Sequence, residues 1–224
     1  MQFQNRLDAG RRLVERLAHY RNHPQAIVLA LPRGGVPVGW EVCRVLNIPL
    51  DIFVVRKIGV PGHEETAMGA IASGGVRVFN KDVIRTLGIR DEAIAAAAAV
   101  AQVELERRET LYRGERFLPD LNGRIVILVD DGMATGASMT AAVQAIKAFN
   151  LQRLVVAVPV ASPEACALLG QAVDEIVCVD TPENFKAVGW WYQDFSQTSD
   201  DEVRMYLNPS HGCVLGVETM ADSC

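Results

Sequence analysis

The sequence predicts an α/β fold in which a parallel β-sheet is flanked by helices. Short runs rich in valine, isoleucine and leucine alternate with helical patterns from residue 27 to residue 179. These runs are apolar throughout, as in Ile27–Leu31 (IVLAL), which is typical of strands covered on both faces. The repeated strand-then-helix order favours parallel strands joined by right-handed crossovers. At 224 residues the chain can form one large domain, or one domain with a small attachment.

The elements are expected in a regular order. The first twenty residues carry leucines at helical spacing among arginines and acids, which predicts an amphipathic helix rather than a signal peptide. The expected strands are 27–31, 51–55, 125–129, 154–160 and 175–179, with a hairpin over 69–79 that turns at residues 73–75. The expected further helices are 40–46, 91–112, 138–149 and 163–169, and the glycine-rich segment 34–39 is expected as a loop.

These patterns divide the chain into a core, a cap and a tail. Residues 1–180 form the core, with a flexible loop over 56–70 and an added helical arm at about 90–114. We expect the arm at a subunit interface, although a solvated charged face explains any single arginine on it. Residues 181–207 hold the clustered aromatic side chains and are expected to cap the sheet. Residues 208–224 give little signal, and a loose tail or a short edge strand both fit them.

Composition excludes several classes of protein. The formal net charge is −5, from 22 basic and 27 acidic residues, which argues against broad non-specific binding of nucleic acid. The five cysteines form no C-x-x-C pair and the four histidines show no metal-ligand spacing, so neither a disulfide framework nor a zinc site is expected. The most apolar window is too short to span a bilayer, and we expect a cytoplasmic protein.

Two predicted strands end in loops that could bind phosphate. In Leu31–Gly35 (LPRGG), Gly34 and Gly35 allow close backbone approach, and Arg33 supplies a permanent planar charge. A tight strand-to-helix turn with an exposed arginine explains this segment equally well. Arg56 and Lys57 follow the next strand, where they could neutralise a polyphosphate, although a solvated pair beside a loop is the usual meaning of such a dipeptide.

A third strand ends in the segment VILVDDGMATGAS, residues 126–138. Asp130 and Asp131 are adjacent, so the charge of one carboxylate disfavours ionisation of the other unless a cation or a hydroxyl-bearing ligand shares their site. The small-residue loop after them precedes a helix, where free backbone N–H groups favour an anion. Thr135 and Ser138 add hydroxyl donors. The two carboxylates can bind a diol, and the loop beside them can bind a phosphate. Together they are suited to a ribose 5-phosphate.

Other phosphate and nucleophile motifs are absent. The sequence has no G-x-x-x-x-G-K-[ST], which excludes a P-loop, and no G-x-S-x-G nucleophile elbow. The glycines at 34, 35 and 39 lack the G-x-G-x-x-G spacing of a dinucleotide fold.

The segment VILVDDGMATGAS resembles the signature of the type I phosphoribosyltransferases, which bind phosphoribosyl diphosphate (PRPP). LPRGG stands where that family has its pyrophosphate loop, RKIGVPGHEETAMG resembles its flexible catalytic loop, and the segment after residue 180 resembles its hood. The similarity covers about residues 25–200 and is strongest to a bacterial and cyanobacterial group of predicted phosphoribosyltransferases. It implies a parallel sheet with a small C-terminal hood.

The resemblance also implies a role for each motif. Asp130 and Asp131 would bind the ribose hydroxyls directly or through Mg²⁺, and Arg56, Lys57 and Asp131 would form the catalytic set. The residues that would bind PRPP are Arg33, Gly34, Gly35, Asp130, Asp131, Ala134, Thr135, Gly136, Ala137 and Ser138. The family's pyrophosphate loop often contains a non-proline cis peptide, which would be Pro32–Arg33 here. Dimers are common in the family, so a homodimer is expected.

Two parts of the chain bear on the base that would accept the ribose. Ala134 stands where the hypoxanthine–guanine branch has an aspartate, which removes one candidate general base. In the hood, Trp190, Trp191 and Tyr192 could stack on a planar base or could simply pack against the cap. Asp194 resembles a hood acid near the metal.

Three functions remain open on sequence alone. The first is Mg²⁺-dependent transfer of 5-phosphoribose from PRPP to a nitrogenous base, with release of pyrophosphate. The second is a regulatory protein that binds PRPP without turnover, because a binding fold alone cannot exclude it. The third is a hydrolase, for which the sequence offers no dedicated group to activate water.

Overall fold

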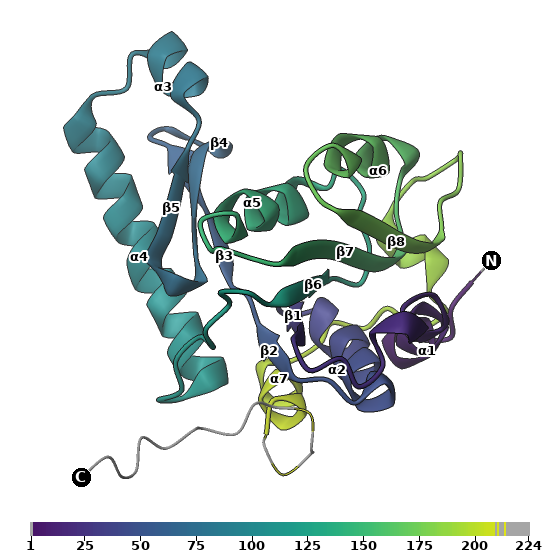
Figure 1. Cartoon of the computed structure of the whole chain (residues 1–224). Coiled ribbons are helices and arrows are strands. Elements are labelled where there is room, and N and C mark those ends of the chain that lie inside the picture. The colour runs from purple at the N-terminus through teal and green to yellow at the C-terminus, as the bar shows by residue number, and fades with distance from the viewer. Residues whose placement is uncertain (1, 209, 211–212, 214–224) are drawn as a thin grey trace, which may run out of the picture.

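The computed structural model describes residues 2–208, 210 and 213. Its centre is a five-stranded parallel sheet in the order β2-β1-β6-β7-β8 (Figure 1). The strands are β1 (Ala26–Ala30), β2 (Leu50–Ile52), β6 (Ile125–Val129), β7 (Arg153–Val160) and β8 (Glu175–Asp180). The predicted fold class is therefore confirmed. Most of the predicted tail, residues 208–224, lies outside the described residues.

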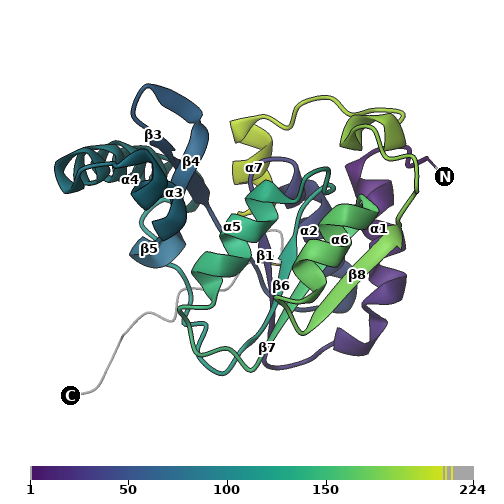
Figure 2. The same cartoon turned by 90° about the horizontal axis from the view of Figure 1, so that it is seen from above.

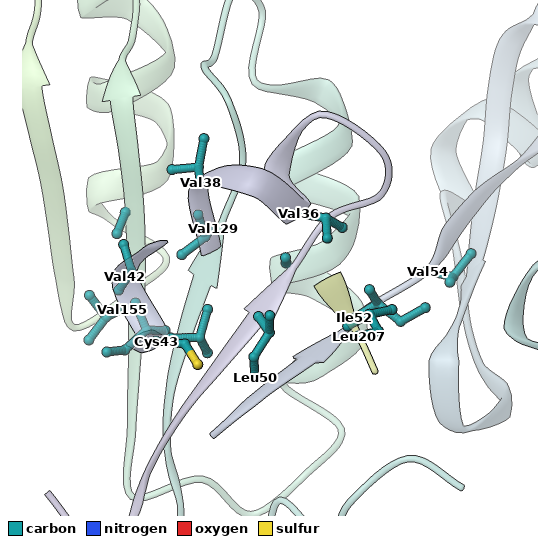
Figure 3. Packing of buried hydrophobic residues seen from close by; sticks show 14 of the residues in the cluster. Val36, Val38, Val42, Cys43, Leu50, Ile52, Val54, Val129, Val155 and Leu207 are labelled. Carbon is teal, nitrogen blue, oxygen red and sulfur yellow. The ribbon is translucent and has the colours of Figure 1, made fainter. Parts of the chain in front are cut away.

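Helices cover both faces of this sheet. Helices α1 (Arg6–Arg16) and α2 (Gly35–Leu46) lie on one face, and α5 (Ala137–Ile146) and α6 (Pro163–Gly170) on the other (Figure 2). Strand β1 shows why its sequence is apolar throughout: Val28 packs into the cluster beneath α2, whereas Ile27 and Leu29 pack beneath α5 and α6. Figure 3 shows the first cluster, in which side chains of α2 meet those of β2, β6 and β7.

A second, antiparallel sheet projects from the end of β2. It consists of β3 (Val55–Val60), β4 (His63–Ala72) and β5 (Val76–Phe79), and β4 and β5 are joined by a 3₁₀ turn, η2 (Ser73–Gly75), where the hairpin was predicted. The segment expected as a flexible loop over 56–70 forms the β3–β4 hairpin, with its turn at residues 61–62. Glycine and proline therefore form a tight hairpin turn here rather than part of a long loop. Whether the hairpin moves stays a prediction.

The helical arm covers one face of this second sheet. Helix α4 (Asp91–Arg113) packs against β3 and β4 with Ala98, Ala101 and Leu105, and it extends along the outer edge of the molecule in both views (Figures 1 and 2). The preceding helix, α3 (Lys81–Leu87), was not predicted. Its local signal is Asn80, whose side chain accepts the backbone N–H groups of the first turn.

The other differences lie at element boundaries. Helix α2 already begins at Gly35, because Pro37 in its first turn is compatible with a helix and Gly34 before it has helical dihedrals, φ −60° and ψ −34°. The cap contains the short helices η3 (Val188–Trp191) and α7 (Asp200–Tyr206), and the 3₁₀ turn η1 (Ala18–Tyr20) follows α1.

Within the described residues, no helix is both long enough and apolar enough to cross a bilayer.

The cap is held by the N-terminal segment. Phe3 forms an isolated parallel bridge with Tyr192, in which the Phe3 N–H donates to the Trp191 carbonyl at 2.7 Å and the Gln193 N–H donates to the Phe3 carbonyl at 2.8 Å. The Asp194 N–H continues the pairing by donating to the Gln4 carbonyl at 2.9 Å. The cap is thus a joint structure of both ends of the described chain, which sequence reasoning did not anticipate.

Candidate functional site

The candidate site lies beyond the carboxyl ends of β1 and β6, where the strand order of the sheet reverses. The chain leaves β1 into α2 on one face and leaves β6 into α5 on the opposite face. A crevice opens at such a switch point in parallel sheets and is their usual ligand site. The Pro32–Gly35 turn and the adjacent acids Asp130 and Asp131 therefore meet at this point.

Gly34 and Gly35 lie directly against the two acids. A Cβ atom on Gly34 would overlap the carboxylate of Asp131, and one on Gly35 would lie 2.6 Å from the Val129 carbonyl oxygen and 2.9 Å from Cα of Asp130. Glycine is needed at both positions because two loops approach each other closely, not because of an unusual backbone angle. A ligand bound to the acid pair would consequently lie next to the backbone of the first loop.

Arg6 in the first turn of α1 binds Asp131. Its Nε and Nη2 lie 2.9 Å and 2.8 Å from Oδ2 of Asp131, and its Nη1 donates to the Ser196 carbonyl at 2.6 Å. The guanidinium carbon also lies 4.1 Å from the centroid of the Phe195 ring. The structure therefore adds to the site a cation that the sequence analysis missed.

Burial keeps both acids from ionising freely. Desolvation raises the pKa of Asp130 well above its usual range, and repulsion from Asp131 adds to this effect. Desolvation also raises the pKa of Asp131, against the opposing attraction of Arg6. The Asp131 N–H offsets part of the cost by donating to Oδ1 of Asp130 at 2.8 Å. The pair is thus poised to take up a proton, a cation or hydroxyl donors.

The loop after the acids forms an open helix N-terminus. Gly136 is the N-cap residue of α5; it has φ +70° and no side chain that could cap the helix. Thr135 accepts the Ala137 N–H at 3.3 Å, and Ala134, Thr135, Ala137 and Ser138 are all exposed. Uncapped N–H groups beside two exposed hydroxyls favour an anion such as a monophosphate.

Ser162, at the N-terminus of α6, supports this loop from behind. Its hydroxyl donates to the Ala134 carbonyl at 2.6 Å and accepts the Ala165 N–H at 3.0 Å, while its own N–H donates to the Met133 carbonyl at 2.9 Å. The Ser-Pro-Glu sequence at 162–164 predicts a helix start, but nothing local indicates which loop the serine would hold.

Arg33 is tied to the cap and to the arm. The Pro32–Arg33 peptide is cis, as the family resemblance implied. Nη1 of Arg33 lies 3.4 Å from Oδ1 of Asp200, which also accepts the Tyr112 hydroxyl at 2.6 Å. A hollow of about 520 Å³ opens beside Arg33 and Asp200. The first loop therefore has a cation in contact with the cap that closes over it.

Arg56 and Lys57 lie on β3 and point to opposite sides of it. Arg56 shares its face with Ile58, which packs beneath α4, whereas Lys57 is exposed on the other face. Among the described residues, neither makes a hydrogen bond or ion pair with the acids, and the buried Nε of Arg56 has no hydrogen-bond partner. Because neighbouring side chains on a strand point to opposite faces, the expectation that both cations meet one diphosphate stays a prediction.

The three cap aromatics differ in what their rings can reach. Tyr192 is buried against Phe3, with ring centroids 5.3 Å apart, and its hydroxyl donates to the Asp131 carbonyl at 2.6 Å. Trp191 is half-buried and stacks on Phe185 at 6.3 Å. Trp190 alone of the three is exposed, with 66% of its surface accessible. Packing is thus the role of Tyr192, which anchors the acid loop. Of the three only Trp190 presents an exposed ring, and Nζ of Lys186 lies over it, 4.6 Å from its centroid.

The acid pair fits Mg²⁺ as a two-carboxylate site. Mg²⁺ prefers hard oxygen ligands and typically binds one or two carboxylates together with substrate phosphates. Asp194, the expected third acid, instead accepts the Ser196 N–H at 2.9 Å. Across the part of the chain that the structure describes, no three or more acid, histidine or cysteine side chains are arranged so that they could hold a metal ion. A metal role for Asp194 stays a prediction without a contact to the pair.

Comparison with known proteins agrees with this geometry. The family model for the phosphoribosyl transferase domain matches residues 2–193. Two curated relatives from Mycobacterium tuberculosis, "Putative phosphoribosyl transferase Rv0571c" of strain H37Rv and "Putative phosphoribosyl transferase MT0597" of strain CDC 1551, are each 46% identical over 209 residues. The match covers 93% of this chain and 47% of each relative, so the chain spans about half the length of the curated relatives it matches.

A solved structure supports the fold. The crystal structure of TT1426 from Thermus thermophilus aligns with a TM-score of 0.82 at 42% identity, and the alignment covers 92% of this chain and 98% of that one. Strand order, the acid pair and the family match together lead to one assignment. This chain belongs to the phosphoribosyl transferase domain family.

Proposed function

We propose that this chain is a Mg²⁺-dependent phosphoribosyltransferase that transfers 5-phosphoribose from PRPP to a nitrogenous base and releases pyrophosphate. The observation that carries the proposal is the close approach of Gly34 and Gly35 to Asp130 and Asp131. This contact places a loop suited to diphosphate beside carboxylates suited to the ribose hydroxyls. The open start of α5 supplies a place for the 5-phosphate.

Each group has a part in the reaction as we propose it. The bond between C1 of the ribose and the diphosphate oxygen breaks, a ring nitrogen of the base bonds to C1, and the base gives up its proton to solvent or to the leaving group. Asp130 and Asp131 orient the ribose hydroxyls, and Arg33 and Arg56 offset negative charge on the departing diphosphate. Bound Mg²⁺ would supply further positive charge to the diphosphate, held by the two aspartates.

The cap would exclude water and contact the base. Gly132 lies beneath η3, where a Cβ atom would lie 2.6 Å from Cγ1 of Val188, so the cap sits tightly over the acid loop. Exclusion of water matters because water competes with the base for C1 of the ribose. Trp190 has the accessible ring that could stack on a planar base. No side-chain acid stands at Ala134, so we place no general base there.

A pyrophosphate-release assay with PRPP, Mg²⁺ and a panel of purines, pyrimidines and related heterocycles tests the proposal. Release with one base is expected, and binding of PRPP without release for any base would favour the regulatory protein instead. Arg56→Ala is expected to lower turnover about 100-fold while changing PRPP affinity much less, because its cation acts on charge that develops as pyrophosphate leaves.

Lys57→Ala is the matched control for this experiment, since the residue is adjacent but faces the other side of β3. We expect it to have the smaller effect on turnover. Equal losses of turnover and affinity in Arg56→Ala would contradict the role of Arg56 in the leaving-group step.

A further inference from the structure

Two cysteines come together at the edge of the central sheet. Cys166 lies on α6 and Cys178 on β8, the last strand of the sheet, and their Sγ atoms are 3.5 Å apart. Helix α6 lies beside β8 in both views (Figures 1 and 2). Both residues are free thiols, and both are half-buried against the cluster beneath α5 and α6. A small oxidant in solvent can therefore reach this pair.

The two sulfur atoms need only a short movement to form a bond. A disulfide bond is about 2.05 Å long, so the Sγ atoms would move about 1.5 Å closer to each other. The other two described cysteines are placed differently, because Cys43 and Cys213 are buried and Sγ of Cys43 donates to the Cys213 carbonyl oxygen at 3.3 Å. Of the four described cysteines, Cys166 and Cys178 therefore form the pair that is both close and accessible.

Helix α6 is in direct contact with the loop that precedes α5. Ser162, the N-cap residue of α6, donates to the Ala134 carbonyl at 2.6 Å, and the Cys166 N–H donates to the Ser162 carbonyl at 3.1 Å. A Cβ atom on Gly136 would lie 3.3 Å from Cβ of Ala165, the residue before Cys166. Because these contacts are close, a movement of Cys166 toward β8 would displace the groups that support the loop.

We propose that Cys166 and Cys178 form a reversible disulfide when the chain meets hydrogen peroxide, and that this bond weakens phosphate binding at the start of α5. The first part depends only on the two thiols, whereas the second rests on the proposed function. The bond is reversible because a thiol reductant can reach a disulfide at this half-buried edge of the sheet. The pair is thus a modification site outside the acid pair and the LPRGG turn.

The reaction takes place in two steps. Burial raises the pKa of the Cys178 thiol, and the neighbouring Cys166 adds to the shift, so we assign the first attack to Cys166. Its thiolate attacks one peroxide oxygen, the O–O bond breaks, and the departing hydroxide takes up the proton that Cys166 lost, which leaves a sulfenic acid. The Cys178 sulfur then attacks the Cys166 sulfur, and the sulfenic oxygen leaves with the Cys178 proton as water. Two thiols and one peroxide thus give one disulfide and two waters.

Peptide mass spectrometry tests the bond on the intact chain. After treatment with hydrogen peroxide and then iodoacetamide, the tryptic peptide 154–186, which contains Cys166 and Cys178 and no other cysteine, should have lost two hydrogen atoms and carry no alkyl group. A further cut after Glu175 should leave its two parts joined. Dithiothreitol added before iodoacetamide should return both thiols.

Single variants identify the two sulfurs. Cys166→Ala and Cys178→Ala should each abolish the joined peptide, and Cys224→Ala, which removes a cysteine outside the described residues, is the control that should keep it. Alkylation of both thiols after peroxide treatment, oxidation of either sulfur to a sulfinic acid without a bond, or loss of the joined peptide in Cys224→Ala would overturn the proposal.

Calorimetry with PRPP and Mg²⁺ tests the effect of the bond on the site. The oxidised chain should bind about three- to tenfold more weakly than the reduced chain, as loss of one hydrogen bond such as that from Ser162 to Ala134 would cause. The Cys166→Ala/Cys178→Ala variant, treated in the same way, should show no change. Equal affinities of the oxidised and reduced chains would overturn the second part of the proposal.

Amide hydrogen exchange separates this outcome from a failure of the proposed function. If the reduced chain binds no PRPP, the proposed function fails, but the disulfide and its effect on the loop can still be measured. Exchange over residues 134–138 should be faster in the oxidised chain than in the reduced one, because the support from α6 is displaced. Unchanged exchange there would overturn the link between the disulfide and the loop.

Discussion

Replacement of both Asp130 and Asp131 by asparagine is expected to reduce affinity for PRPP with Mg²⁺ by about 100-fold or more. Each carboxylate would make charge-assisted hydrogen bonds worth about 1.5–3 kcal/mol, and two of them correspond to about 10²–10⁴-fold in the dissociation constant. The amides keep the shape of the side chains but lose the charge that a divalent cation requires. Isothermal titration calorimetry with PRPP and Mg²⁺ measures the change, with Asp82→Asn on exposed α3 as the control.

The pH dependence of this affinity follows from the raised pKa of Asp130. Since burial favours the protonated acid, the carboxylate forms only as pH rises through the raised pKa, and affinity for the Mg²⁺ complex should rise with it. The double asparagine variant should lack that dependence. Replacing Asp130 with asparagine also removes a carboxylate whose charge is costly to bury. This replacement is therefore not expected to unfold the protein and abolish binding in that way. Unchanged affinity in a folded variant would contradict the site assignment.

Arg113→Met is expected to lower the free energy of unfolding by about 3–5 kcal/mol, because it leaves a buried carboxylate without its partner. Arg113 is 4% exposed at the end of α4, and its Nε lies 3.0 Å from Oδ1 of Asp51. It also donates to the Ile52 carbonyl at 2.6 Å and to Glu109 at 2.8 Å. These contacts join the arm to the end of β2. Urea denaturation at fixed protein concentration measures the loss.

A second variant and a change of pH distinguish the lost ion pair from a general packing defect. Without Arg113, the pKa of buried Asp51 rises further above its value in the unfolded chain, so the stability of the folded form is greatest at low pH and falls as pH rises. The deficit of Arg113→Met should therefore be smaller at about pH 5 than at about pH 7.5. Arg113→Met/Asp51→Leu should regain much of the loss. An equal deficit at both pH values would indicate that packing, not charge, is responsible.

The core of the fold was predictable because its signals are local. Strand β6 was predicted with its observed bounds, and the strand-then-helix order led to the correct sheet, since a fully apolar run between turns has few other interpretations. The β3–β4 hairpin was not predicted. Its glycines and proline have the same local meaning in a tight turn as in a loop, and only pairing with β5 and packing beneath α4 decide between the two.

The candidate site could be recognised from sequence where its residues are adjacent along the chain, and not where residues come together from distant segments. The acid pair, the LPRGG turn and the α5 start can each be recognised within a few residues, whereas Arg6 and Ser162 act on loops far along the chain. One signal for Arg6 was present: an arginine in the first turn of a helix opposes the helix dipole, which indicates a partner elsewhere. The role of Tyr192 was hidden because aromatic composition does not reveal burial.

The contacts of Arg6 have a consequence for the order of folding. Its guanidinium joins Asp131, 125 residues away, to Ser196, 190 residues away. Pairs so distant in sequence form late, because closing long loops costs entropy that only an assembled core repays. During synthesis β1 and β6 can pair well before residue 196 has emerged, so the sheet can form while Arg6 still lacks the Ser196 carbonyl that binds its Nη1. A nascent chain stopped between residues 160 and 190 should therefore have a formed sheet edge but an Arg6 side chain without its partner in the cap.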